Sequence, residues 1–109
     1  MMKKIIKIYE IEKGKQPFAE WLESIRTSDK KIYLRIQDRL MRIAEFGVYG
    51  DVKSVGEGVF ELRFFFGPGY RVYFGEEGDT IVLLLCGGDK RTQREDIKKA
   101  KAYWRHYHE

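Results

Sequence analysis

Apolar and polar residues alternate at the start of the chain and then change to a helical spacing. Residues 3–10 alternate, which predicts a first strand. From Pro17 onward, apolar residues recur at the spacing of one face of a short amphipathic helix. The polar run at residues 26–29 interrupts this pattern. We therefore expect one strand followed by one short helix.

A second apolar stripe predicts another helix over residues 32–46. Gly47 is a natural terminator for it. Thr27 or Ser28 can cap its start, with Asp29 favourably placed in the first turn. Beside the stripe runs a basic row, which we interpret first as a solvated face and second as a surface for phosphates: Lys31, Arg35, Arg39 and Arg42.

Three strands joined by tight turns are predicted in the second half of the chain. A glycine-rich loop comes first, with a short extended piece around Val52–Val55. Beyond it, four apolar residues alternate with Glu61, Arg63 and Phe65, so these three side chains should lie on the opposite face of a strand. Gly67–Gly69 then turns the chain.

The turn suggests a register for this hairpin. If Phe66 lies opposite Tyr70, Tyr73 faces Arg63 and Arg71 faces Phe65. Arg63 and Arg71 then become diagonal neighbours on one face of the sheet.

A second turn and a last helix follow. Pairing Glu76 with Asp79 adds three residues to the apolar face: Ile81, Leu83 and Leu85. Thr92 and Glu95 have the spacing of a capping box that opens the helix. Its apolar stripe consists of Ile97, Ala100, Trp104 and Tyr107. A basic row beside the stripe consists of Arg94, Lys98, Lys101 and Arg105.

This order of elements predicts an α+β fold. We expect a small antiparallel sheet, two N-terminal helices packed on one face of it and a C-terminal helix, in the order β-α-α-β-β-β-α. At 109 residues, the chain should form a single domain spanning residues 1–109. One cysteine excludes an internal disulfide, and no apolar run approaches the ~20 residues that span a membrane, so we expect a cytoplasmic protein with no membrane partner.

The net charge of +4 is unevenly distributed. Residues 90–105 hold seven lysines and arginines against two acids, whereas the remainder of the chain is close to neutral. A basic segment on a nearly neutral body favours a polyanion or an acidic protein as partner. A solvated helix face is an equally good interpretation of that segment.

The hairpin face with Arg63 and Arg71 is the candidate site. Because the apolar face must meet the two N-terminal helices, we expect both guanidiniums on the uncovered side, with Glu61 and Tyr73. Neighbouring guanidiniums repel unless an anion or Glu61 offsets them, and a phosphodiester matches them bidentately. Lys90 and Arg91 follow the next strand and should converge on this edge.

Such a set suits metal-free RNA cleavage, in which a 2′-hydroxyl attacks the adjacent phosphate. The arginines would stabilise the phosphate, Glu61, once freed from Arg63, or Tyr73 would accept the proton, and Lys90 would protonate the leaving oxygen. We expect no cofactor. The competing interpretations are that Arg63 and Glu61 form an ordinary charge ladder and that Tyr73 packs under the last helix.

Three stretches in a fixed order carry a family resemblance. FELR, GYRVYF and GGDK-x-x-Q, together with the segment from PFAEWLESI onward, resemble the RelE/ParE superfamily of bacterial toxins, and most closely its HigB-like, phage-associated addiction module killer subgroup. By this resemblance Arg71 contacts the scissile phosphate, Arg63 is the basic residue of the preceding strand, and Lys90 or Arg91 is the basic residue after the last strand. Gln93 lies nearest to the C-terminal catalytic position.

The resemblance implies a toxin of a type II toxin–antitoxin pair. It would be neutralised by a helix-turn-helix antitoxin that covers its basic face, and its target would be the ribosome and mRNA, as a ribosome-dependent endoribonuclease. The alternatives are a ParE-like inhibitor of DNA gyrase and a non-catalytic basic nucleic-acid-binding domain. The candidate catalytic residues are Arg71, Arg63, Lys90 and Glu61. The candidate RNA-binding residues are Lys53, Tyr73, Arg91, Gln93, Arg94 and Lys98.

Overall fold

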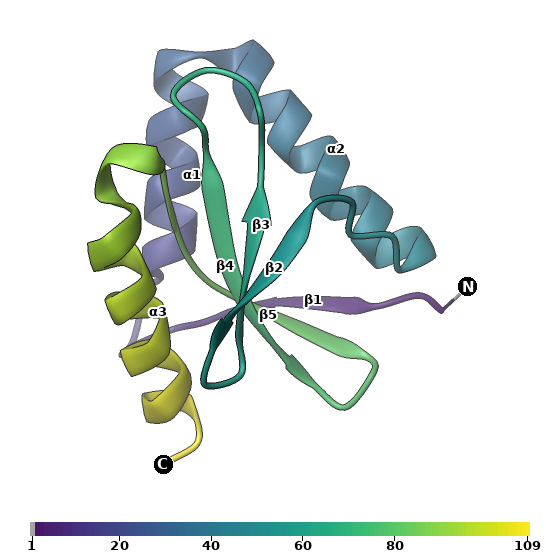
Figure 1. Cartoon of the computed structure of the whole chain (residues 1–109), viewed down its shortest axis with the longest axis vertical. Coiled ribbons are helices and arrows are strands. Elements are labelled where there is room, and N and C mark those ends of the chain that lie inside the picture. Colours follow the sequence, from purple (N-terminus) through teal and green to yellow (C-terminus); the bar gives the residue numbers. More distant parts are fainter. Residues whose placement is uncertain (1) are drawn as a thin grey trace.

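A computed structural model describes residues 2–109 (Figure 1). The strands are β1 (Ile5–Ile8), β2 (Val52–Gly56), β3 (Val59–Arg63), β4 (Arg71–Glu77) and β5 (Ile81–Gly88). The helices are α1 (Pro17–Ser28), α2 (Lys30–Phe46) and α3 (Gln93–Tyr107), with a short 3-10 turn, η1 (Lys90–Thr92), before α3. No helix among residues 2–109 has the length and apolarity needed to span a bilayer.

The five strands form one mixed sheet in the order β1-β5-β4-β3-β2. The α+β prediction is confirmed, but the expected antiparallel sheet is wrong in one respect. β1 pairs with β5 in parallel, with Ile5 opposite Ile81, whereas the other neighbours pair antiparallel. The two helices α1 and α2 carry the chain from β1, at one edge of the sheet, to β2, at the other, so β1 and β2 never pair with each other (Figure 1).

Each face of the sheet has its own hydrophobic core. On one face, α1 and α2 pack against residues such as Leu62 and Phe74. On the other, Ala100 and the rest of the α3 stripe pack against Val59 and Tyr73. The expected uncovered face is therefore wrong, because α3 covers much of it. The alternative interpretation of Tyr73 as a core residue under the last helix is confirmed, since its side chain is fully buried there.

The first hairpin has a different register from the expected one. Arg63 lies directly opposite Arg71, and the amide of Phe64 donates to the carbonyl of Tyr70 at 3.0 Å. The loop is thus wider than a tight turn over Gly67–Gly69. A shift of two residues keeps every side chain on its predicted face, so the two arginines still share one face of the sheet.

The predicted register of the second hairpin is wrong by an odd number of residues. Glu76 pairs with Val82 instead of Asp79, and a bulge interrupts the ladder between Tyr73 and Phe74. Because an odd shift moves a strand's side chains to the other face, Leu83 and Leu85 belong to the core under α3. Val82 and Leu84 take the predicted places facing α1 and α2.

α2 ends at the predicted glycine, but the capping residues at the starts of α2 and of the last helical segment differ from the predicted ones. Asp29, rather than Thr27 or Ser28, caps α2, and its side chain accepts from the amides of Lys31 and Ile32. Gly47 ends α2 with a φ of 67°, as predicted. At the last helix, the predicted Thr92–Glu95 box is wrong. The capping box is formed by Asp89 and Thr92 around η1, because the chain makes one extra turn there before α3.

Candidate nucleic-acid interface

A buried polar network joins β3, β4 and α3 around Glu61. Glu61 is 1% exposed, and its Oε2 accepts from the hydroxyl of Tyr73 at 2.9 Å and from Nε2 of Gln93 at 2.7 Å. Its Oε1 lies 3.8 Å from Nε of Arg71. The expectation that Glu61 pairs with Arg63 is therefore wrong. The register of the hairpin contributes to the difference, since it places Tyr73 opposite Glu61, whereas the predicted register placed Tyr73 opposite Arg63.

Burial and the nearby Glu61 carboxylate raise the pKa of Tyr73 well above its usual range. The phenol therefore stays protonated and donates to Glu61. A protonated, fully buried phenol cannot take a proton from a substrate. The geometry gives Tyr73 a supporting role beneath the site.

Arg71 is held on several sides. Its Nη1 donates to the carbonyls of Gly69 at 2.9 Å and Tyr70 at 3.2 Å, while Nε finds no hydrogen-bond partner within residues 2–109. The residue as a whole is 7% exposed. These contacts fix the guanidinium next to the hairpin loop.

Arg71 and Lys90 line one open hollow of about 380 Å³ at the end of the first hairpin. Its other lining residues are Phe64, Phe65, Gly67, Pro68 and Gly69. The start of η1 touches the hairpin, because the amide of Lys90 donates to the carbonyl of Pro68. We call this hollow the loop pocket. Its charged lining residues are both cationic, so it suits an anion.

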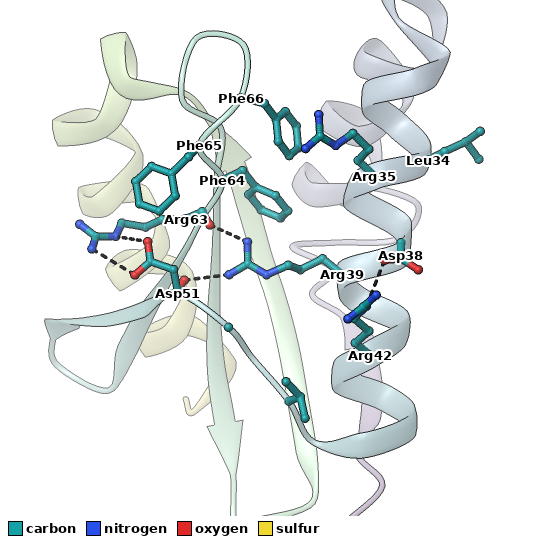
Figure 2. A pocket seen from close by; sticks show the side chains of 12 residues that line it. Leu34, Arg35, Asp38, Arg39, Arg42, Asp51, Arg63, Phe64, Phe65 and Phe66 are labelled. Atoms are coloured by element: carbon teal, nitrogen blue, oxygen red, sulfur yellow. Dashed lines mark hydrogen bonds and ion pairs between the residues drawn. The ribbon is translucent and has the colours of Figure 1, made fainter.

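Arg63 points to the rim of a second hollow. It forms a two-pronged contact with Asp51, at 2.9 Å and 3.1 Å, and its side chain is 32% exposed. Figure 2 shows this pair beside the exposed ring of Phe65. Arg71 and Arg63, which face each other across the hairpin, thus line two neighbouring hollows.

The second hollow, of about 590 Å³, lies between α2 and β3, and we call it the helix groove (Figure 2). Its charged lining residues are Arg35, Arg39, Arg42 and Arg63 against Asp38 and Asp51. Arginine is therefore in excess in this lining. The solvated-face interpretation of the α2 row is wrong for Arg39, which is partly buried and binds backbone carbonyls across the groove. Arg35 is exposed, as that interpretation expects, and its guanidinium stacks 3.9 Å over the ring of Phe66.

The remaining predicted RNA-binding residues line neither of these hollows. Lys53 is exposed on β2 opposite Glu61. Arg91 pairs with Asp89, and Lys98 pairs with Glu95 on the exposed side of α3. Arg94 is exposed in the first turn of α3. Gln93 is the one that the fold brings to Glu61.

The sequence-based reasoning missed Asp51 and Phe65 as site residues. Asp51 could not be predicted as the partner of Arg63, because no sequence pattern links an acidic residue in a glycine-rich loop to an arginine twelve residues away. Phe65 carried a signal: it is an aromatic residue at a position that alternation assigns to the polar face. Its side chain is 78% exposed.

No family model matches the chain. An uncharacterized protein of Haemophilus influenzae is 48% identical to it over 84 residues, which are 77% of this chain and 82% of that protein. The chain belongs to the same family as this Haemophilus protein.

Proposed function

We propose that the chain is a toxin of the RelE/ParE superfamily, of the HigB-like group, that cleaves mRNA on the ribosome. The order of helices and strands and the position of the FELR and GYRVYF stretches on paired strands support this proposal. The observation that carries it is the loop pocket, in which Arg71 and Lys90 converge from β4 and η1 on one open hollow.

In the proposed reaction, the scissile phosphate occupies the loop pocket. The 2′-oxygen forms a bond to phosphorus while the bond from phosphorus to the 5′-oxygen breaks. Arg71 and Lys90 stabilise the charge that develops on the phosphate, and Lys90 gives a proton to the leaving oxygen. Arg71 is already fixed by its carbonyl contacts, so little reorganisation is needed when the phosphate arrives.

The buried position of Glu61 favours a positioning role over that of a base. Glu61 is 1% exposed and Tyr73 and Gln93 hold its Oε2, so the carboxylate would have to leave this buried network to reach a substrate hydroxyl. We therefore propose that a ribosomal group accepts the 2′-hydroxyl proton. This account makes cleavage dependent on the ribosome and predicts no cleavage of free RNA at a comparable rate.

Induced expression followed by primer-extension mapping of transcripts tests the proposal. The wild-type chain should arrest translation and leave discrete cuts in mRNA. Lys90→Ala is the decisive variant, because Lys90 is exposed and its removal leaves the buried network intact. We expect this variant to lose most of the arrest, whereas Arg26→Ala, which removes an exposed cation paired with Glu23 on α1, should keep it. Intact transcripts under arrest, or full activity of Lys90→Ala, would overturn the proposal.

One observation favours a second candidate, a non-catalytic toxin such as a ParE-like gyrase inhibitor. The lining of the loop pocket, within residues 2–109, includes no carboxylate or histidine that could act as acid or base. Such a protein would stall replication and leave mRNA whole. The same mapping experiment separates the two candidates.

We further propose that a helix-turn-helix antitoxin neutralises the chain. It would place an acidic segment over the basic hollows, so the complex should weaken as salt is raised. Co-expression with the protein encoded by the adjacent reading frame tests this, with relief of arrest as the readout.

A further inference from the structure

Phe65 is the most exposed large apolar side chain among residues 2–109. It stands on the loop of the first hairpin, and Figure 2 shows its ring turned away from Phe64 and Phe66, which point toward α2. Phe64 is 2% exposed and belongs to the core under α1 and α2. The core therefore does not account for Phe65.

Phe65 lies on the ridge between two basic hollows. It lines the loop pocket with Arg71 and Lys90, and it also lines the helix groove with Arg35 and Arg63. The guanidinium carbon of Arg63 lies 5.8 Å from the centre of the Phe65 ring. An exposed aromatic ring thus has cations on both sides.

This arrangement matches the repeating chemistry of a single nucleic-acid strand. Phosphates alternate with bases along such a strand, and proteins bind it by pairing cations with phosphates and stacking aromatic rings on bases. An acidic peptide would satisfy the arginines, but it has no regular partner for an isolated aromatic ring. The charges and the ring together favour a nucleic-acid strand.

We propose that Phe65 is a stacking platform for one unpaired RNA base, with the flanking phosphates in the loop pocket and in the helix groove. This inference rests on the proposed function and adds to it that the substrate is bound single-stranded across the ridge. The base carries no required identity, because any base offers a face for stacking.

Binding of fluorescein-labelled RNA decamers, measured by anisotropy at fixed low salt, tests the inference. One probe is an oligoadenylate, and the other has the same backbone with abasic residues in place of the bases. Phe65→Ala should weaken binding of the oligoadenylate by about 5- to 160-fold, the range for the loss of one base stack. It should leave binding of the abasic probe unchanged, because the phosphate contacts remain.

Two further variants control the test. Phe46→Ala removes another exposed phenylalanine, 55% exposed at the end of α2, and should change neither affinity. Phe65→Trp keeps an aromatic face and should retain the binding of oligoadenylate. An equal loss on both probes, or no loss on either, would overturn the stacking role.

The outcomes also separate this inference from the proposed nuclease activity. If Phe65→Ala binds oligoadenylate normally and Lys90→Ala still abolishes mRNA cleavage, the stacking role is wrong and the nuclease proposal stands. If the chain cuts no mRNA but Phe65→Ala selectively loses oligoadenylate, the nuclease proposal is wrong and the stacking role stands.

Discussion

Arg63 and Arg71 lie directly opposite each other on β3 and β4, and each guanidinium is paired with a different carboxylate. Arg63 pairs with Asp51 at the edge of the helix groove, and Arg71 pairs with the buried Glu61. Like charges placed opposite each other in a sheet destabilise it unless they are compensated. Here both are compensated by the protein itself. The two pairs differ in burial, so they should respond differently to mutation.

The Arg71–Glu61 pair should be costly to break on one side. Its side chains are 9% and 1% exposed, so Arg71→Met leaves a carboxylate buried without its cation. We expect that variant to lose about 3–5 kcal/mol of unfolding free energy. The double variant Arg71→Met, Glu61→Gln should recover most of this loss, because no unpaired charge remains. Urea denaturation of Arg71→Met, Glu61→Gln and the double variant measures the three losses of unfolding free energy. A loss in the double variant equal to the sum of the two single losses would contradict the pairing.

The sequence predicted which face of the sheet a side chain occupies only where the predicted strand register was correct or differed from the observed one by two residues. Alternation along β3 placed the side chains of Phe60 and Leu62 on one face of the sheet and those of Glu61 and Arg63 on the other. The two-residue error in the register of the first hairpin did not change these faces. The second hairpin was predicted wrongly because its turn closes in another register, with Glu76 opposite Val82 instead of Asp79. This shift is odd, and an odd shift moves every side chain of the strand to the other face.

Arg39 should stabilise the fold, although it occupies a row that looks uniformly solvated in sequence. It donates to the carbonyls of Tyr49 at 3.0 Å and Asp51 at 2.9 Å, and also to that of Arg63. Arg39→Ala should therefore cost about 2–4 kcal/mol, since several carbonyls lose a charged donor. Arg42→Ala, one turn further along α2, removes only an exposed pair with Asp38 and should cost less than about 0.5 kcal/mol. Denaturation curves of both variants compare them; equal losses would assign Arg39 to the surface.

The site could be predicted in part, for a physical reason. Arg71 was placed near Glu61 and Lys90 because strand order and a short turn bring them together, and the two-residue shift of the first hairpin keeps Arg71 and Glu61 on one face. Asp51 was not assigned to the site, and Gln93 was assigned to RNA rather than to Glu61, since each reaches the hairpin from a loop or helix whose approach depends on packing. Three-dimensional proximity across 12 to 32 residues leaves no periodic trace in the sequence.

Asp51 should limit nucleic-acid binding by occupying Arg63. Asp51→Asn removes this competing carboxylate and leaves the backbone contacts of residue 51 in place. One additional phosphate contact steepens the plot of log affinity against log salt by about 0.7, which corresponds to about five-fold tighter binding of oligoadenylate at 0.1 M salt. Anisotropy titrations at several salt concentrations measure the slope.

Glu57→Gln is the matched control for that experiment. It removes the same charge from a residue that pairs with Lys101 and Arg105 on α3, and Glu57 lines neither hollow. An identical gain in the two variants would show that net charge, and not the release of Arg63, controls the affinity.

Removing the negative charge of Asp96 should stabilise the fold. Its carboxyl is buried at the start of α3, where the hydroxyl of Thr92 donates to it at 2.5 Å. Burial raises the pKa of Asp96 in the folded chain, so the folded state binds this proton more readily than the unfolded state. The stabilising contribution of the proton is complete below the unfolded pKa and is lost as pH rises through the folded pKa.

Asp96→Asn should therefore raise the melting temperature at pH 7 by about 2–5 °C, and this difference should shrink as pH falls toward roughly 4. The gain is smaller than a full burial penalty because a negative charge is favoured in the first turn of a helix. Thermal melts from pH 4 to pH 7 give the difference directly. Asp79→Asn, at the exposed turn between β4 and β5, controls for the change in net charge. A melting temperature that falls at pH 7 in Asp96→Asn alone would mean that the carboxylate is held by its partners more strongly than burial opposes it.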